Sequence, residues 1–399
     1  MTSTARDENI ATLQLLVGLD ASKADAVVDA RAVLTVGNGN ARPVADLICR
    51  LLQRTIKDVR EDPAEFTAVE IIVGDAQPRT TAPKVWVMAD GLMLRIGTRC
   101  APSGPFCSPP IFNLIAACHA AATAVRLLAP AGRLTFTDPI LVDPAAIMGG
   151  SLDSISRQTR FGKTFLAGAG AVGNAFVFAL GMLDVEGELH IVDPDIVTDG
   201  NLNRTLLFEL DDIGQPKVSV LVRRAAPFLP GVRLVPRMCR IQDLEERGPH
   251  AWLERLVVGV DSRRARRRLQ DELPLHVFDA STTGIAEAVL TFGTAGSNYA
   301  CMGCLYPLDL VENQHESHIA SVLGVSVEDV QTHHVSEAAA LAIATLYPSL
   351  SPKDLVPPGR SCTGFSFSPR LGAVRPLERA IVLKVPGDVR FNLGAEVLL

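Results

Sequence analysis

The sequence predicts an α/β protein built on a Rossmann-like, doubly wound sheet, and residues 165–193 carry most of that prediction. There an apolar run leads into a glycine-rich turn, a helix-like stretch and a second apolar run that ends on Asp193. The glycines of the turn have the spacing GxGxxG and are Gly168, Gly170 and Gly173. A strand, a glycine turn, a helix and a second strand, followed by an acid, are typical of a nucleotide-binding βαβ unit.

Each residue of this unit has a physical reason to be there. Gly168 permits the tight turn, Gly170 lets the backbone approach a pyrophosphate, and Gly173 lets the helix pack closely against the strand. The N–H groups at the start of the helix then face the phosphates. Asp193 is placed to accept hydrogen bonds from a ribose hydroxyl group. We therefore predict a nucleotide site at this turn.

The residues after Asp193 carry charges that a glycine turn alone does not need. Asp195 is followed by Asn201-Leu202-Asn203-Arg204, then by Gly214-Gln215-Pro216-Lys217, and an apolar run at 256–260 ends on Asp261. Because open α/β sheets bind ligands at the carboxyl ends of their strands, we expect these side chains near one edge of the sheet.

This set of charges favours one reaction class over another. Hydride transfer by an NAD(P)-dependent oxidoreductase would use the glycine turn but leaves Arg204, Lys217 and Asp261 without a role. Attack of a carboxylate on the α-phosphorus of ATP needs all three. Arg204 and Lys217 would hold the phosphates, and Asp261 would hold Mg²⁺, which prefers a carboxylate together with phosphate oxygens.

Each of these residues also has a purely structural interpretation. Lys217 would be a solvated residue at a helix start, and Asp261 would be the N-cap of a helix at 262–273. Arg204 would pair with Asp195 or Asp199 at the surface. The combination of all of them at these intervals favours the site.

The motifs in this order resemble the ThiF/MoeB/HesA group of ubiquitin-activating-enzyme-like adenylyltransferases, over about residues 160–306. That group has GxGxxG, then DxDxVxxxNLNRQ, then GxPK, then a strand that ends on Asp. The resemblance implies ATP and Mg²⁺ as cofactors. It assigns Asp193 to the ribose, Arg204 and Lys217 to the phosphates, and Asp261 to the metal. The rest of the motif, Asp195, Asn201 and Asn203, is assigned to the nucleotide.

The resemblance further implies that ATP adenylates a C-terminal carboxylate and that pyrophosphate is released. The acceptor would be a small ubiquitin-like or sulfur-carrier protein, or a ribosomal peptide. Two departures leave a non-catalytic nucleotide-binding scaffold open: Thr205 stands where the group has glutamine, and the second CxxC of the group is missing. The group's RxxRQ segment is compressed into residues 157–160, which leaves open how the site is completed.

The cysteines leave a zinc site open. Cys301-Met302-Gly303-Cys304 resembles the first half of the group's CxxC…CxxC zinc site, but no second CxxC follows and only Cys362 remains downstream. Four histidines at residues 315, 318, 333 and 334 would complete a site, or they are ordinary polar loop residues. A thioester between one of these cysteines and the activated substrate is a third interpretation.

The first 150 residues repeat the pattern of the nucleotide unit in altered form. Residues 31–53 run through an apolar stretch, Gly37-Asn38-Gly39 and a helical stretch, and a strand at 69–73 leads to Asp75. Arg42 occupies the third glycine position, so a phosphate could not be held in the same way. We predict two domains, residues 1–150 and 151–399, joined through a linker at 138–153. The first is either a degenerate Rossmann-like unit, which would form an internal pseudo-dimer, or an unrelated accessory domain, which would leave a homodimer.

Composition sets the remaining expectations. The 399 residues include 48% hydrophobic and 21% charged residues, as in a soluble globular enzyme. The net charge of −6 gives no case for general nucleic-acid binding. We interpret the arginines at 263–268 as a solvated helix face neutralised by Asp271 and Glu272. The eight cysteines do not form a disulfide framework.

Two further patterns concern location. The apolar stretch at 111–128 contains Asn113, His119 and Arg126, which predicts a buried helix rather than a membrane span. The first residues lack the charged and apolar pattern of a signal peptide, and we expect a cytoplasmic protein. Gly162-Lys163-Thr164 precedes a strand and lacks the earlier glycine of a P-loop, so it is not one.

Overall fold

A computed structural model of the chain describes residues 2–63, 65–90, 93–99, 106, 108–130, 138–143, 158–244, 253–283, 287–297, 300–306, 317, 320–321, 323–332, 334–346, 348, 352, 363–368, 373–376 and 383–384. The chain divides into two compact units, one of Met1–Gly303 with Glu396–Leu399 and one of Cys304–Ala395. The predicted domain boundary at residue 150 lies outside the described residues.

The first sheet of the larger unit has six strands in the order β2-β1-β3-β4-β5-β6. The strands are β1 Arg31–Val36, β2 Asp58–Arg60, β3 Val69–Val73, β4 Lys84–Asp90, β5 Met93–Gly97 and β6 Ile140–Val142. β1 to β4 run parallel, and β5 and β6 are antiparallel to their neighbours. β6 lies inside the stretch at 138–153 that the sequence analysis took for a linker, so that prediction was too long at its start.

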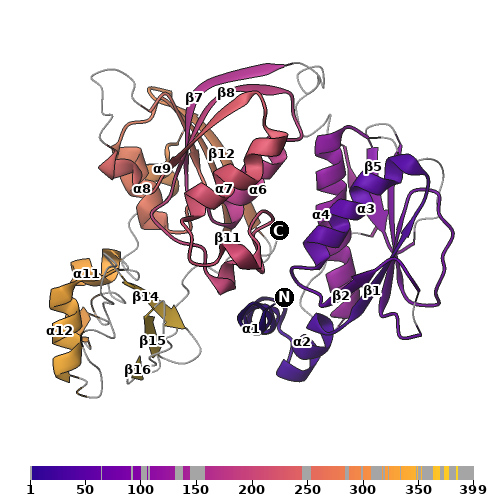
Figure 1. Ribbon diagram of the computed structural model, residues 1–399, viewed down its shortest axis with the longest axis horizontal. Helices are drawn as coiled ribbons and strands as arrows, with labels where there is room; N and C mark the ends of the chain where they lie inside the picture. The colour runs from indigo at the N-terminus through magenta and orange to yellow at the C-terminus, as the bar shows by residue number, and fades with distance from the viewer. Residues whose placement is uncertain are drawn as a thin grey trace. The chain divides into compact units, whose positions relative to one another are not determined.

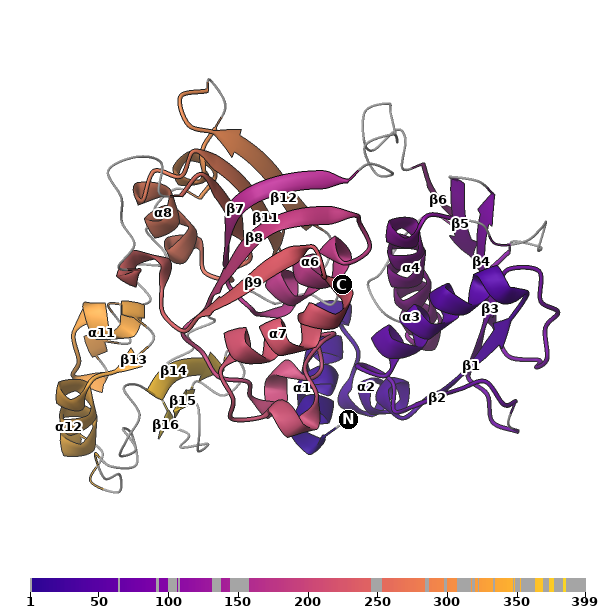
Figure 2. The same cartoon turned by 45° about the horizontal axis from the view of Figure 1, so that its top comes forward.

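Helices α3 (Arg42–Leu52) and α4 (Pro110–Leu128) lie along one face of this sheet, as both views show (Figures 1 and 2). α4 is long and apolar enough to cross a membrane by length and composition alone. Its buried residues, among them Phe112, Ala116 and Ala120, instead join the hydrophobic core of the unit. The predicted buried helix at 111–128 is therefore confirmed.

Short helices precede the first sheet. α1 (Ser3–Thr12) begins where the Thr2 hydroxyl accepts a hydrogen bond from the N–H of Ala5. A π-helical turn, Leu13–Val17, and α2 (Ala21–Val28) follow. Leu13, Val27 and Val28 form a small buried cluster that packs against Leu128 at the end of α4.

The second sheet of the same unit has the order β12-β11-β10-β7-β8-β9. Its strands are β7 Thr159–Ala167, β8 Val185–Val192, β9 Val232–Arg237, β10 Arg255–Val258, β11 His276–Thr283 and β12 Glu287–Thr294. All neighbours are parallel except β11 and β12. Counted from β7, this is the strand order of the doubly wound Rossmann fold, with the switch point between β7 and β10. The predicted fold class is confirmed.

Three helices connect these strands: α6 (Ala171–Leu180), α7 (Lys217–Ala225) and α8 (Arg263–Asp271). α6 starts directly after the glycine turn, and Phe176 on it lies 6.4 Å from Phe278 of β11, between ring centroids. The 3₁₀ turns Asp199–Asn201 and Leu210–Asp212 lie between β8 and α7. These connections bring the predicted motifs to the carboxyl ends of the parallel strands.

The first sheet also has six strands and follows a similar plan. β1 has β2 on one side, reached through α3, and β3 on the other side, so its strand order also reverses beside the first strand. In the second sheet β8 corresponds to β2, and a further strand, β9, lies beyond it. This topology favours a degenerate Rossmann-like unit over an unrelated α/β domain for the N-terminal part.

The arginine cluster at 263–268 is not uniformly solvated. Arg266 is 3% exposed and pairs with the fully buried Asp279 of β11. It also donates to the carbonyls of Val260 and, at 3.1 Å, Ala280. The interpretation as a solvated face was therefore wrong for Arg266, because helix α8 directs this one side chain into the interior.

The smaller unit contains short elements. Its helices are α11 Val327–Thr332 and α12 Glu337–Leu346, and its strands β13 His334–Val335, β14 Thr363–Ser368, β15 Ala373–Pro376 and β16 Leu383–Lys384 form an antiparallel sheet in chain order. Helix α9 (Met302–Leu305) crosses the division between the units. Three of the four histidines (315, 318 and 333) and Cys362 lie outside the described residues.

Candidate functional site

The glycine turn has the backbone that the spacing predicted. Gly168 has a φ of +99°, which L side chains rarely adopt. A Cβ atom on Gly173 would lie 1.9 Å from the carbonyl oxygen of Gly168, so no larger residue fits there. A Cβ atom on Gly170 would meet nothing within 4 Å. The turn is therefore closed on the strand side and open at Gly170.

Asp193 is anchored to this turn. Its carboxylate accepts hydrogen bonds from the N–H of Ala169 at 2.7 Å and from the N–H of Asp195 at 2.8 Å, and the residue is 7% exposed. Burial raises the pKa of the Asp193 carboxyl, although the nearby Lys217 acts in the opposite direction. The predicted ribose ligand thus lies directly beside the glycine turn.

Lys217 is held close to the same acids. Its Nζ lies 2.9 Å from Oδ2 of Asp195, and its backbone N–H donates to the Asp195 carbonyl, also at 2.9 Å. A β-bridge between Ile196 and Pro216 joins the two segments. The Lys217 side chain is only 12% exposed, so the interpretation as a solvated helix-start residue was wrong.

Asp261 follows the end of β10 at the same edge of the sheet. β10 pairs with β7, and the N–H of Gly259 donates to the carbonyl of Ala167 at 2.8 Å, so Asp261 follows the strand beside the glycine turn. Asp261 is exposed. The N-cap of α8 is Ser262, whose hydroxyl accepts from the N–H of Ala265, and not Asp261. The carboxylate of Asp261 therefore has no capping function.

Arg204 belongs to a second cluster, which reaches the N-terminal helix α1. Its Nη1 lies 3.0 Å from Glu8 and donates to the Gly200 carbonyl at 2.7 Å and to the amide oxygen of Asn203 at 3.1 Å. The ion pair is thus made with Glu8 rather than with Asp195 or Asp199. The buried Asn203 in turn donates to Asn9 at 3.3 Å.

The remaining motif residues shape the backbone around Arg204. The amide oxygen of Asn201 accepts from the N–H of Thr198 at 3.0 Å and caps the 3₁₀ turn. Thr205, which replaces the group's glutamine, is buried and donates to the Asn201 carbonyl at 2.8 Å. Asn201, Asn203 and Thr205 therefore hold the loop in place, and direct contact of the two asparagines with a nucleotide stays a prediction.

The loop at 202–209, which includes the end of this motif, is held by hydrogen bonds from two sides. Asn174 of α6 accepts a hydrogen bond from the N–H of Leu207 at 2.9 Å. Arg54, in the turn after α3, donates to the carbonyls of Leu202, Leu206 and Phe208 and to the Glu209 carboxylate. Sequence reasoning missed Glu8, Asn9, Arg54 and Asn174, because no local motif marks a residue whose partner lies so far along the chain.

Comparison with known proteins places these observations in a family. The profile described as "ThiF family" matches residues 151–355, which is more than half of the 399 residues. The chain belongs to the ThiF family. A second profile, described as "E1 N-terminal domain", matches residues 1–145. We refer below to these two regions as the ThiF domain and the E1 N-terminal domain.

Among the curated relatives are two eukaryotic proteins. The "NEDD8-activating enzyme E1 catalytic subunit" of Arabidopsis thaliana is 32% identical over 127 residues, which cover 32% of this chain and 27% of that protein. The "Ubiquitin-activating enzyme E1-like" protein of Saccharomyces cerevisiae is 31% identical over 134 residues, 32% of this chain and 21% of that protein. The chain thus spans about a quarter of the length of these relatives.

Solved structures add a weaker likeness. One is the "Crystal structure of E. coli MccB + AMPCPP + SeMeT MccA", which is 18% identical and covers 58% of this chain and 64% of that chain with a TM-score of 0.33. A TM-score this low does not establish a shared fold. The family assignment rests on the ThiF profile, and the fold on the strand order described above.

In its described residues the structure suits the predicted Mg²⁺ site but not the predicted zinc site. The exposed Asp261 carboxylate lies at the same edge as the open space beside Gly170, which suits a Mg²⁺ ion that takes a carboxylate and phosphate oxygens. Cys301 and Cys304 are exposed. In the described residues no three His, Cys, Asp or Glu side chains are arranged to hold a metal ion, so the structure gives no support to zinc there.

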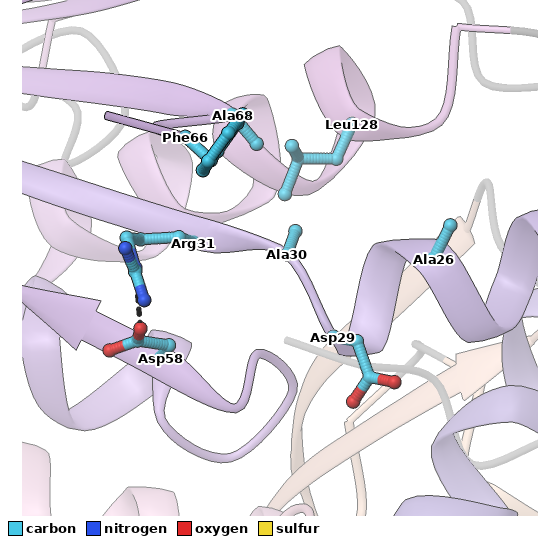
Figure 3. Close-up of a pocket in the computed structure, with 8 residues that line it drawn as sticks. All are labelled: Ala26, Asp29, Ala30, Arg31, Asp58, Phe66, Ala68 and Leu128. Atoms are coloured by element: carbon cyan, nitrogen blue, oxygen red, sulfur yellow. Dashed lines mark hydrogen bonds and ion pairs between the residues drawn. The ribbon is translucent and has the colours of Figure 1, made fainter. Parts of the chain in front are cut away.

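Two pockets lie in the E1 N-terminal domain. The first, about 430 Å³, is lined by residues such as Asp29, Arg31, Asp58 and Leu128, and Arg31 pairs with Asp58 at 2.6 Å on one side of it (Figure 3). Arg31 and Asp58 begin β1 and β2, so the pocket lies at the amino ends of the strands. Ligands of open α/β sheets bind at the opposite edge, which separates this pocket from the candidate site.

The second pocket, about 670 Å³, lies at the carboxyl ends of β1 and β3 and includes Gly37, Arg42, Glu61 and Arg79. In the first sheet it occupies the edge that the candidate site occupies in the second sheet. Arg42 pairs there with Glu61 and, at 3.0 Å, with Asp46. The arginine at the third glycine position is thus engaged by two of the protein's own carboxylates.

Proposed function

We propose that the chain is an ATP-dependent adenylyltransferase that activates the C-terminal carboxylate of a small protein or peptide. The observation that carries this proposal is the cluster of Asp193, Asp195 and Lys217 beside a glycine turn that is open at Gly170. Membership of the ThiF family and the eukaryotic relatives named for ubiquitin-like activation support it.

In the proposed reaction a carboxylate oxygen of the acceptor attacks the α-phosphorus of ATP. The bond between the α-phosphorus and the bridging oxygen to the β-phosphate breaks, and pyrophosphate leaves. A carboxylate is ionised at neutral pH, so no general base is required. The protein supplies position and charge: Asp193 holds the ribose, Lys217 and Arg204 hold the phosphates, and Asp261 is the residue that would hold Mg²⁺.

We further propose that the acceptor is a ubiquitin-like protein, a sulfur-carrier protein or a ribosomal peptide with a free C-terminus. The relatives' names refer to ubiquitin and NEDD8, and they support a small protein in that place. Since the E1 N-terminal domain supplies Glu8 and Asn9 to the Arg204 cluster, we propose that one chain completes its own site as an internal pseudo-dimer.

The test is calorimetric titration of the purified protein with ATP·Mg²⁺ and, separately, with NADH. We expect the wild type to bind ATP·Mg²⁺ and Lys217→Ala to bind it about 10- to 100-fold more weakly, the effect of losing a charged hydrogen bond. Lys57→Ala is the matched control, because the Lys57 side chain is 70% exposed.

Binding of NADH that Lys217→Ala leaves unchanged would instead identify an oxidoreductase. A second assay follows exchange of labelled pyrophosphate into ATP with peptides that end in Gly-Gly. ATP binding without any exchange, across a panel of carboxylate acceptors, would identify a scaffold and contradict the proposed reaction.

A further inference from the structure

The loop at 202–209 in the ThiF domain is buried but has no regular secondary structure. Leu202, Leu206, Leu207 and Phe208 are all at most 9% exposed. In such a loop the backbone carbonyls have no strand or helix partner, and a buried carbonyl without a donor costs about 1–3 kcal/mol. The loop therefore depends on donors from elsewhere in the protein.

Arg54 of the E1 N-terminal domain supplies these donors. Its Nη1 donates to the carbonyls of Leu202 at 3.2 Å and Phe208 at 3.0 Å. Its Nη2 donates to the carbonyl of Leu206 at 3.2 Å and to the Glu209 carboxylate at 3.0 Å. The Leu206 carbonyl also accepts from Nη2 of Arg50 at 3.5 Å. Four acceptors spread over one loop match the planar fork of the Arg54 guanidinium group, a geometry that a lysine ammonium does not reproduce.

Arg54 is itself fixed. Its backbone carbonyl accepts a hydrogen bond from the side chain of Asn9 at 2.7 Å, and Asn9 accepts one from Asn203. The Arg54 side chain is 16% exposed. The network thus runs from the turn after α3, through α1, to the residue directly before Arg204.

The acceptors of Arg54 lie on both sides of Arg204 in the chain, at Leu202 before it and at Leu206 and Phe208 after it. We propose that Arg54 is a positioning residue for the nucleotide site: it fixes the loop that carries Arg204, and so couples the E1 N-terminal domain to ATP binding in the ThiF domain. This inference rests on the proposed function, because it assigns Arg204 to the phosphates.

The experiment compares Arg54→Ala and Arg54→Lys with Arg60→Ala, a control in the same domain whose side chain is 60% exposed. The readouts are calorimetric affinity for ATP·Mg²⁺, KM for ATP and kcat in pyrophosphate exchange, and the thermal midpoint. We expect Arg54→Ala to weaken ATP·Mg²⁺ binding at least tenfold and to raise KM more than it lowers kcat. Arg54→Lys should restore the thermal midpoint more fully than the affinity, and Arg60→Ala should change neither.

A double-mutant cycle separates positioning from general stability. If Arg54 acts through the Arg204 loop, Arg54→Lys should weaken ATP·Mg²⁺ binding much less in an Arg204→Ala background than in the wild type. Equal effects in both backgrounds, or a lowered thermal midpoint with unchanged affinity of the folded protein, would overturn the inference and leave Arg54 a structural residue. Should Arg54→Ala fail to fold, the cycle with Arg54→Lys still decides.

The outcomes for this inference and for the proposed function are distinct. A wild-type protein that binds no ATP·Mg²⁺ contradicts the proposed function, and this inference falls with it. If the wild type, Arg54→Lys and Arg54→Ala all bind ATP·Mg²⁺ with the same affinity, only the role of Arg54 is contradicted.

Discussion

Arg204 and Glu8 form an ion pair, with 3.0 Å between Nη1 and Oε2, although 196 residues separate them in the chain. Glu8 belongs to helix α1 of the E1 N-terminal domain, and Arg204 to the asparagine-rich motif of the ThiF domain. The Arg204 side chain is 26% exposed and the Glu8 side chain 43%. The guanidinium that we propose for the ATP phosphates is thus paired with a carboxylate from the E1 N-terminal domain.

Glu8→Gln should therefore strengthen ATP·Mg²⁺ binding. The substitution keeps a hydrogen-bond acceptor beside Arg204 but removes a negative charge that competes with the phosphates. A partly exposed pair is worth about 0–1 kcal/mol, which corresponds to a gain of up to about fivefold in affinity. Titration calorimetry measures it, with the exposed Glu65→Gln as control. Weaker binding in Glu8→Gln would mean that Glu8 helps to place Arg204 rather than competing with the phosphates.

The glycine turn offers a matched pair of substitutions. Gly173→Ala places a Cβ atom 1.9 Å from the Gly168 carbonyl oxygen and should destabilise the protein by about 1–3 kcal/mol or more. Gly170→Ala meets nothing within 4 Å, so its free energy of unfolding should stay near that of the wild type, while ATP·Mg²⁺ binding falls. Urea unfolding and calorimetry on both variants check this. Normal ATP binding by Gly170→Ala would show that no phosphate approaches that position.

The buried pair of Arg266 and Asp279 should be important for stability. Asp279 is fully buried, and Asp279→Ala leaves the Arg266 charge without its ion-pair partner. We expect a loss of about 3–5 kcal/mol in the free energy of unfolding, as for other broken buried pairs. Arg263→Ala, on the exposed part of the same helix, should cost under about 0.5 kcal/mol. Similar losses in both variants in a urea titration would contradict the assignment of Arg266 to the interior.

We expect Glu70 to make part of the free energy of unfolding depend on pH in the acid range. Burial acts to raise the pKa of its carboxyl, but hydrogen bonds from Thr35, from the Arg79 N–H and from Thr80 outweigh it and lower the pKa below the ordinary value of 4.5. A pKa that is lower in the folded state means that the unfolded state binds the proton more tightly. This contribution is therefore present above about pH 4.5 and lost as the pH falls through the folded pKa.

The comparison of wild type with Glu70→Gln between about pH 3 and pH 7 isolates this contribution. The wild type should lose more unfolding free energy on acidification than the variant does. Glu65→Gln serves as control, because that side chain is exposed. A variant with the same acid dependence as the wild type would exclude Glu70 as its source.

In the ThiF domain the sequence was sufficient to predict those elements whose pattern lies within a few neighbouring residues. The glycine turn, its helix, the strand before Asp193 and the strand before Asp261 all follow the predicted order, because strand and helix periods and glycine spacing are expressed within a few residues. The strand at 69–73 and the helix at 111–128 could also be predicted from the sequence. Whether the first sheet is a degenerate counterpart of the second stays one of two interpretations, which its strand order favours.

An error arose where packing decides the environment of a side chain. Arg266 looks in the sequence like a member of a solvated helix surface, but the fold buries it against Asp279. For Lys217 a solvated position was one of two interpretations, and the structure places it against Asp195 instead. The N-cap of α8 is Ser262 and not the neighbouring Asp261, since cap geometry depends on the backbone angles of a single residue.

By itself, the sequence determined which residues of the ThiF domain end its strands and begin its helices, and so which side chains meet at the edge of the sheet. Only the tertiary structure decided that Glu8, Asn9 and Arg54 complete the surroundings of Arg204. The physical reason is the range of the interactions. Glycine turns and strand ends are set by neighbouring residues, whereas the donors for a buried, irregular loop come from whichever segment the packing of two domains brings against it.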